Sequence, residues 1–193
     1  LIQTYLDHLT VERGMSRHTV AAYGRDLRRY ASYLADQGIT DPSQVTSGMI
    51  GSYLARLREG VPAPDGTGWI EPPLASASAA RAVIAVRSLH RFARAEGLTA
   101  DDPARSIRPP KPPRRLPKAL SLEQVQAMLA APATDTEVGI RDAALLELLY
   151  GTGMRISEAV ALDVDDVDRL VRAGAGEAIP GLRVLGKGGK ERL

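Results

Sequence analysis

The sequence contains no cysteine, and aromatic residues make up only 4% of its 193 positions. Without cysteine the chain can form neither disulfides nor thiolate metal sites, which suits a reducing compartment. It has no apolar run near the roughly 18 residues that span a bilayer, and no charged-then-apolar signal segment opens it. We therefore expect a cytoplasmic protein without membrane contact, whose core consists mainly of aliphatic and alanine side chains.

The net charge of +2 conceals an asymmetry along the chain. Residues 1–118 carry 17 basic and 11 acidic side chains, whereas residues 119–193 carry 8 basic and 12 acidic ones. The first part therefore has a charge of +6 and the second a charge of −4. Such an asymmetry indicates a polyanionic partner for the basic part.

Helical periodicity predicts four helices in the first hundred residues, and hence a compact bundle. They cover about residues 1–9, 17–37, 47–59 and 76–96. Ser16 is a candidate N-cap and Gly38 a candidate C-terminal stop for the second helix. The stretch 61–73, between the last two helices, contains four prolines and two glycines and is predicted to be a loop.

Two of these helices carry arginine rows opposite an apolar stripe. On the second helix the stripe steps by three or four residues from Val20 to Leu34, as an amphipathic helix requires. The polar faces contain His18, Arg25, Arg28 and Arg29 on the second helix, and Arg87, His90, Arg91 and Arg94 on the fourth. One such row is usually a solvated face, but two rows also suit DNA phosphates, with a helix in the major groove. The residues alone leave both interpretations open.

A basic, proline-rich segment follows the predicted bundle. Six prolines between Pro103 and Pro117 exclude a helix and favour an extended chain. Its basic residues are Arg105, Arg108, Lys111, Arg114, Arg115 and Lys118. About 14 extended residues reach roughly 40 Å, enough to pass around a DNA duplex, although a plain spacer also explains the composition. The predicted division is residues 1–102, linker 103–118 and residues 119–193.

The last part is expected to combine helices with a short strand. Ser121 and Gln124 form a capping box for its first helix. A second helix, about residues 140–150, is apolar almost all round, so we expect it to be buried and then broken by Gly151 and Gly153. A short helix resumes afterwards, and a strand at 182–185 leads into a glycine-rich turn.

Two cofactor or metal motifs are present only in part. Gly181, Gly186 and Lys187 match the front of a phosphate-binding loop, but Gly188 stands where that motif needs Ser or Thr. The acidic run at 163–168 lacks the glycine and glutamate of a calcium-binding loop, so we expect a solvated turn. We therefore predict no metal and no cofactor.

The stretch YGTGMRISEA, residues 150–159, places one arginine where an apolar helix breaks at glycine. Glu158 lies three residues after Arg155, on the same side of the resumed helix, and can orient its guanidinium. A planar guanidinium suits two oxygens of one phosphate, and Lys187 on the glycine-rich turn can supply a proton. A phosphate site and a surface salt bridge both fit these residues.

The stretches LLYGTGMRISEAVALDVDDVD and VLGKGGKERL resemble the catalytic domain of tyrosine site-specific recombinases. YLDHLTVERGMSRHTVAAYGRDLRRYASYL resembles the N-terminal core-binding domain of that family, and PPKPPRRLPKALS resembles its linker, so nearly the whole chain is covered. Within the family the sequence is most similar to the chromosome-dimer-resolving Xer group, and more to the XerD type than to XerC. The implied fold is mainly α: a SAM-like core-binding domain of four helices, a basic linker, and the first part of an α+β catalytic domain with a small β-hairpin.

The resemblance also implies roles for the matching residues. Arg155 would clamp the scissile phosphate in the transition state, supported by Glu158, and Lys187 would protonate the 5′-oxygen leaving group. The implied or expected DNA contacts are Arg25, Arg29, Arg87, Arg91, Arg94, Lys111, Arg114, Arg115, Lys190 and Arg192. In the family a tyrosine forms a 3′-phosphotyrosyl bond, so neither ATP nor metal is needed. The implied partners are a double-stranded DNA recombination site, a second Xer-type recombinase in a heterotetramer, and a DNA-translocase activator at the septum.

The sequence departs from the family where the remaining catalytic residues should follow. No His comes after His90 and no Tyr after Tyr150, so the His-x-x-Arg pair and the tyrosine nucleophile are missing. We therefore expect it to be the N-terminal part of a longer recombinase, binding DNA without cutting it, and the start at Leu1 suggests a trimmed chain. A phage or transposon integrase of the same fold, and a truncated DNA-binding regulator, are the open alternatives.

Overall fold

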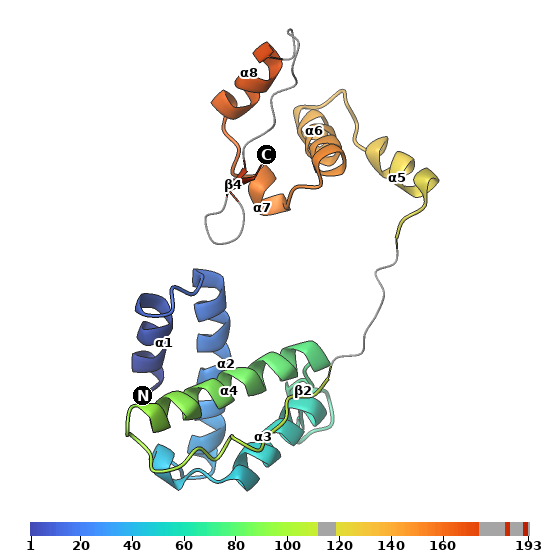
Figure 1. Ribbon diagram of the computed structural model, residues 1–193. Helices are drawn as coiled ribbons and strands as arrows, with labels where there is room; N and C mark the ends of the chain where they lie inside the picture. Colours follow the sequence, from blue (N-terminus) through green and yellow to red (C-terminus); the bar gives the residue numbers. More distant parts are fainter. Residues whose placement is uncertain (112–118, 174–183, 186–190, 193) are drawn as a thin grey trace. The chain divides into compact units, whose positions relative to one another are not determined.

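The computed structural model describes residues 1–111, 119–173, 184–185 and 191–192 (Figure 1). For residues 169–173, 184–185 and 191–192 it describes the backbone alone. The chain divides into two compact units, Leu1–Arg115 and Leu116–Leu193. The expected mainly helical fold is confirmed, and the strands in the described ranges form two small antiparallel pairs. No helix among the described residues is long and apolar enough to cross a membrane.

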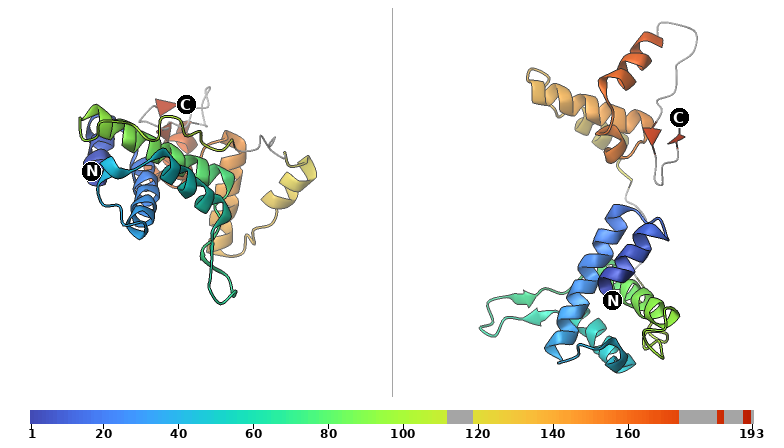
Figure 2. Two further views of the ribbon diagram at one scale, coloured as in Figure 1. Left: turned by 90° about the horizontal axis from the view of Figure 1, so that it is seen from below. Right: turned by 90° about the vertical axis from the view of Figure 1, so that its left-hand side faces the viewer.

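The first unit is the predicted bundle of four helices (Figure 2). These are α1 Ile2–Val11, α2 Arg17–Asp36, α3 Ser47–Glu59 and α4 Ser76–Ala95, with the 3-10 turn η1 Pro42–Gln44 before α3. The predicted cap of α2 is confirmed, because the Ser16 hydroxyl oxygen accepts the N–H of Thr19 at 3.3 Å. Gly38 follows the end of α2 with φ of 73°, a left-handed conformation that favours glycine.

Apolar side chains of α2, α3 and α4 supply most of the core of the first unit. Its largest fully buried side chains are Leu27, Tyr30, Ile50, Tyr53, Val83 and Val86, together with the polar Asp26 and His90. The rings of Tyr30 and Tyr53 lie 5.0 Å apart and join α2 to α3. The predicted stripe on α2 therefore faces the core, although its end members Val20 and Leu34 are only partly buried.

The stretch 61–73 contains a β-hairpin, which corrects the prediction of a plain loop. The strands β1 Val61–Pro62 and β2 Trp69–Glu71 pair in antiparallel fashion and project from the bundle (Figure 2). Arg56 on α3 donates from Nε and Nη2 to the Glu71 carboxylate at 3.1 and 2.7 Å. Gly60 has φ of 76°, and a Cβ there would lie 2.7 Å from the Glu71 carbonyl oxygen. An ion pair to α3 and a glycine in a left-handed conformation thus accompany the hairpin, and a count of prolines reveals neither.

The chain after α4 turns back onto the bundle. Ala104 is fully buried, and Ile107 packs against the core of the first unit. The N–H of Ala104 donates to a carboxylate oxygen of Asp102 at 3.0 Å, which fixes the turn. The first residues of the expected linker therefore lie against the first unit, and an extended linker from residue 108 to 118 stays a prediction.

The described part of the second unit contains four helices and a short strand pair. They are α5 Leu122–Leu129, α6 Glu137–Thr152, α7 Ile156–Ala159, α8 Val164–Ala173, β3 Val184–Leu185 and β4 Glu191–Arg192. The predicted capping box is confirmed, since Ser121 and Gln124 exchange hydrogen bonds of 3.3 and 2.9 Å. The predicted strand is confirmed in its described residues, where Val184 pairs with Arg192 and Leu185 with Glu191. The glycine-rich turn between them, 186–189, lies outside the described residues.

Two expectations about α6 are wrong. The helix continues through Gly151 and ends at Gly153, whose φ of 62° and ψ of 18° are left-handed. Only one of the two glycines therefore breaks it. The helix is also less buried than its composition predicts, because Ile140 and Tyr150 are more than half exposed. Among the described elements α6 packs mainly against α5 and α7. These two short helices cover only part of the apolar surface of α6.

The acidic run at 163–168 begins a helix and is not the solvated turn expected from the sequence. Asp163 accepts the N–H of Asp166 at 3.0 Å, and Asp166 accepts the N–H of Asp163 at 3.2 Å. This reciprocal pair caps α8 in the manner of a capping box. Carboxylates in a first turn also complement the positive end of the helix dipole, which explains why so acidic a stretch is helical.

Candidate functional site

The turn between α6 and α7 places Arg155 at the start of α7. Met154 precedes it and is buried against Leu148 and Leu149 of α6, which anchors the chain at this point. Arg155 itself has an extended backbone, with φ of −76° and ψ of 148°, and serves as the N-cap residue of α7. Its side chain is 57% exposed, so the guanidinium is available to a ligand.

Glu158 holds Arg155 through both its backbone and its side chain. One carboxylate oxygen accepts the N–H of Arg155 at 2.8 Å, and the other accepts Nη1 of its guanidinium at 2.7 Å. The Glu158 side chain is only 4% exposed. Burying a carboxylate is costly unless a cation pairs with it. The buried Glu158 carboxylate therefore restrains the exposed Arg155 guanidinium. The predicted orientation of Arg155 by Glu158 is observed directly in this geometry.

The chemistry of this pair suits an oxyanion. An arginine has five N–H donors in a planar fork, and the bond to Glu158 engages one of the two on Nη1. The remaining donors match the spacing of two phosphate oxygens. Among the described residues no group of three or more His, Cys, Asp or Glu side chains could hold a metal ion.

Several predicted site residues lie outside what the structure describes. These are Lys187, Lys190, Arg114 and Arg115, while Arg192 is described by its backbone in β4 and Lys111 is exposed at the end of a described range. The register of β3 and β4 shows that Lys187 belongs to the segment connecting the two strands. A convergence of Lys187 with Arg155 stays a prediction.

The arginine row of α2 is on the surface of the first unit. Arg25 and Arg28 are exposed, and the side chain of Arg29 is 39% exposed. Nη1 of Arg29 lies 3.7 Å from the buried carboxylate of Asp26, one turn earlier. In this row Arg29 is restrained by the buried Asp26, whereas Arg25 and Arg28 are exposed on the surface of the first unit.

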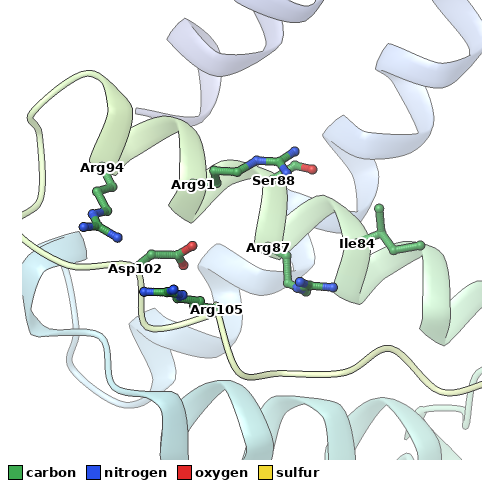
Figure 3. Close-up of a pocket in the computed structure, with 7 residues that line it drawn as sticks. All are labelled: Ile84, Arg87, Ser88, Arg91, Arg94, Asp102 and Arg105. Carbon is green, nitrogen blue, oxygen red and sulfur yellow. The ribbon is translucent and has the colours of Figure 1, made fainter.

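The arginine row of α4 lines a pocket of about 390 Å³ (Figure 3). Its lining residues are Ile84, Arg87, Ser88, Arg91, Arg94, Asp102 and Arg105. Four arginines and one aspartate leave a formal excess of three positive charges. The predicted residues Arg87, Arg91 and Arg94 therefore do come together on one face of α4. Such a face attracts polyanions.

Arg105 joins this face although the sequence assigned it only to the linker. The turn that follows α4 returns through Asp102, whose backbone oxygen accepts the N–H of Arg105 at 3.2 Å. Burial of Ala104 fixes the turn, and the Arg105 side chain then lies opposite α4 (Figure 3). The sequence Asp102-Pro-Ala-Arg105 could have indicated a turn at this position. Only the burial of Ala104 in the structure shows that the turn brings Arg105 toward α4.

His90 does not belong to the arginine row, contrary to the expectation. Its side chain is 1% exposed, and Nε2 lies 2.9 Å from the hydroxyl of Tyr30. Burial lowers the pKa of His90, which favours a neutral ring. The residue lies four positions after Val86 and therefore shares the apolar side of α4. His90 is thus a core residue and not a DNA contact.

Both units match known protein families. Residues 2–97 match the phage integrase N-terminal SAM-like domain, and residues 118–192 match the phage integrase family. Tyrosine recombinase XerD of Mycobacterium tuberculosis is 48% identical over 196 aligned residues, covering 100% of this chain and 59% of that protein. Tyrosine recombinase XerD of Corynebacterium glutamicum is 43% identical, covering 100% of this chain and 60% of that protein.

The fold and these matches define a two-unit protein, in which a helical SAM-like unit is followed by a unit of the phage integrase family. The chain belongs to the phage integrase family of tyrosine recombinases. It spans about three fifths of the length of the curated relatives that it matches.

Proposed function

We propose that this chain is the DNA-clamping and phosphate-binding portion of a site-specific tyrosine recombinase. The observation that carries the proposal is the restraint of the exposed Arg155 guanidinium by the buried Glu158. The restrained guanidinium of Arg155, at the start of α7, can hold the two non-bridging oxygens of one phosphodiester. The family match of residues 118–192 supports this assignment over a surface salt bridge.

The proposed reaction is an exchange of one phosphoester for another. A tyrosine hydroxyl attacks phosphorus and releases its proton to water, and the bond from phosphorus to the 5′-oxygen breaks. The leaving oxygen takes a proton from Lys187, which regains one from water. Arg155 stabilises the negative charge that grows on the phosphate oxygens in the transition state. Because the 3′-phosphotyrosyl bond preserves the phosphoester, a second hydroxyl can rejoin the strand without ATP.

The tyrosine in this scheme is not among these 193 residues, since no Tyr follows Tyr150 and no His follows His90. We infer that a longer chain carrying this sequence performs the reaction, and that the 193 residues alone bind DNA without cleaving it. The first unit provides the grip on DNA through the arginine faces of α2 and α4.

The biological role proposed is the resolution of chromosome dimers at cell division. The support is the similarity to proteins named tyrosine recombinase XerD in three bacterial species. The partners follow the same proposal: a double-stranded recombination site, a second Xer-type recombinase, and a DNA-translocase activator.

The test uses a nicked duplex from which a covalently trapped protein cannot be released. The 193-residue chain should shift this DNA in a native gel and leave no covalent adduct in a denaturing gel. A longer protein carrying the downstream tyrosine should leave the adduct on the same DNA. An adduct from the 193 residues contradicts the division of roles, and no adduct from the longer protein contradicts the recombinase function.

A further inference from the structure

Helix α2 packs against α4 (Figure 1). The carboxylate of Asp26 on α2 is buried there and bonds Arg81 on α4. Asp26 is 1% exposed. One of its oxygens accepts Nε of Arg81 at 2.9 Å, and the other accepts Nη2 of Arg81 at 3.4 Å. Nη1 of Arg29 lies 3.7 Å from the same carboxylate. Removing a carboxylate from water is costly unless cations pair with it, so Asp26 draws both guanidinium groups to this position.

The two arginines reach from this buried group to the surface. The side chain of Arg81 is 44% exposed, and that of Arg29 is 39% exposed. Arg81 uses Nε and one N–H of Nη2 toward Asp26. Since a guanidinium has five N–H groups, three donors of Arg81 lie on its other edges. The fork is therefore fixed on one side and available on the other.

The pair joins the two helices of the first unit that carry the arginine rows. Arg29 follows Arg25 by one turn of α2, and Arg81 lies ten residues before Arg91 on α4. The hydroxyl of Tyr53 on α3 donates to the backbone oxygen of Asp26 at 3.4 Å and so ties the site to the core. Arg81 was absent from the DNA contacts expected from the sequence.

We propose that Arg81 and Arg29 form a preorganised binding site for a DNA backbone phosphate, and that Asp26 is its positioning residue. This inference rests on the DNA binding proposed above. A long side chain that is ordered only on binding loses rotamer freedom at that moment. Asp26 orders the two arginines beforehand, so the phosphate meets donors already in place.

Asp26 can affect DNA affinity in two ways, which predict opposite changes when its charge is removed. Its negative charge repels phosphates, so a purely electrostatic role predicts tighter DNA binding when Asp26 is neutralised. A positioning role predicts weaker binding, because the arginines lose their anchor. The direction of the change therefore separates the two roles.

The first test compares two charge-conserving variants of the 193-residue chain, Arg81→Lys and Arg58→Lys. Arg58 is an exposed residue of α3 and serves as the matched control. Lysine at position 81 can satisfy Asp26 with its ammonium but presents no outer fork. We expect Arg81→Lys to weaken binding to a fluorescent duplex by about tenfold, and Arg58→Lys to change it less than about twofold. Equal affinities of the two variants overturn the proposal.

The second test is Asp26→Asn, with folding checked by far-UV circular dichroism. We expect binding about threefold or more weaker, although the variant gains one positive charge. Unchanged or tighter binding by a folded variant overturns the positioning role. If this variant does not fold, Arg81→Lys decides alone. A parent chain that fails to bind the duplex contradicts the proposed function itself, whereas a binding parent with an unaffected Arg81→Lys contradicts only this inference.

Discussion

The hydroxyl of Tyr30 and Nε2 of His90 lie 2.9 Å apart in the core of the first unit, joining α2 to α4. Both side chains are 1% exposed. Nδ1 of His90 has no hydrogen-bond partner among the described residues. Protonation of this imidazole would therefore place a charge in the core, where burial opposes it more than the charge of Asp102 favours it.

This pair predicts a pH dependence of the stability of the first unit. Burial lowers the pKa of His90 in the folded chain, whereas the unfolded imidazole titrates near about 6.5. Between these two values the unfolded chain binds more protons, so stability is lost as the pH falls below about 6.5. Urea unfolding at pH 7 and at pH 5 should show this loss in the parent and less of it in His90→Gln. His18→Gln, which alters an exposed histidine, should behave as the parent. Equal pH dependence in all three proteins would refute the assignment.

The ion pair of Arg56 with Glu71 should hold the hairpin onto α3. Hydrogen bonds from Arg56 lower the pKa of Glu71, so their contribution is present above about pH 4.3 and is lost as the pH falls through the lowered value. Because both side chains are about one quarter to one third exposed, we expect Glu71→Gln to cost about 1 kcal/mol. Trp69, the single tryptophan, lies on β2 and reports the change by fluorescence during unfolding. Glu59→Gln, an equal charge change at an exposed position of α3, should have little effect. A matching response from both variants would exclude a special role for Glu71.

Glu158→Gln should loosen the start of α7. An amide has one acceptor oxygen, so the variant loses one of the two bonds to Arg155 and the charge pairing as well. A lost hydrogen bond to a charged group typically costs about 1.5–3 kcal/mol, which corresponds to about tenfold or more faster amide exchange. Hydrogen exchange of residues 150–162, measured by mass spectrometry, checks this expectation. The control is Glu147→Gln on the exposed side of α6. Unchanged exchange in Glu158→Gln would mean that the pair does not restrain Arg155.

The arginine faces of α2 and α4 should each contribute to the salt dependence of DNA binding. Each lost phosphate contact lowers the slope of log K against log salt by about 0.9. Arg25→Ala and Arg91→Ala should therefore each lower it by about that amount, and the double variant by about twice as much. Arg58→Ala supplies the control. Slopes equal to that of the parent would show that these rows are merely solvated faces.

Local signals in the sequence predicted much of the fold. Ser16 and Ser121 cap their helices as expected, because an N-cap depends on residues within one turn. The hairpin at 61–73 was missed because its contact with α3 runs through Arg56, which lies outside the stretch itself. The helix that begins in the acidic run at 163–168 was not predicted, because the composition does not show that Asp163 and Asp166 cap it.

The candidate site was predictable only in part. Arg155 and Glu158 lie three residues apart, so a helical spacing suffices to pair them. Asp26 and Arg81 are 55 residues apart, and only the packing of α2 on α4 brings them together. His90 was wrongly predicted to lie on the arginine side of α4 for the same reason. It is four residues from both Arg94 and Val86, and only its contact with Tyr30 shows that it lies in the core. Contacts across the bundle cannot be derived from periodicity within one helix.

The most direct test of the account is Arg155→Ala in a longer protein that carries this sequence and the downstream tyrosine. Its cleavage of a nicked duplex and its affinity for that duplex are measured together, with Arg141→Ala as an exposed control. We expect cleavage to fall by at least about a hundredfold while the Kd changes less than about threefold. Cleavage at the parental rate would contradict the assignment of Arg155 to the scissile phosphate.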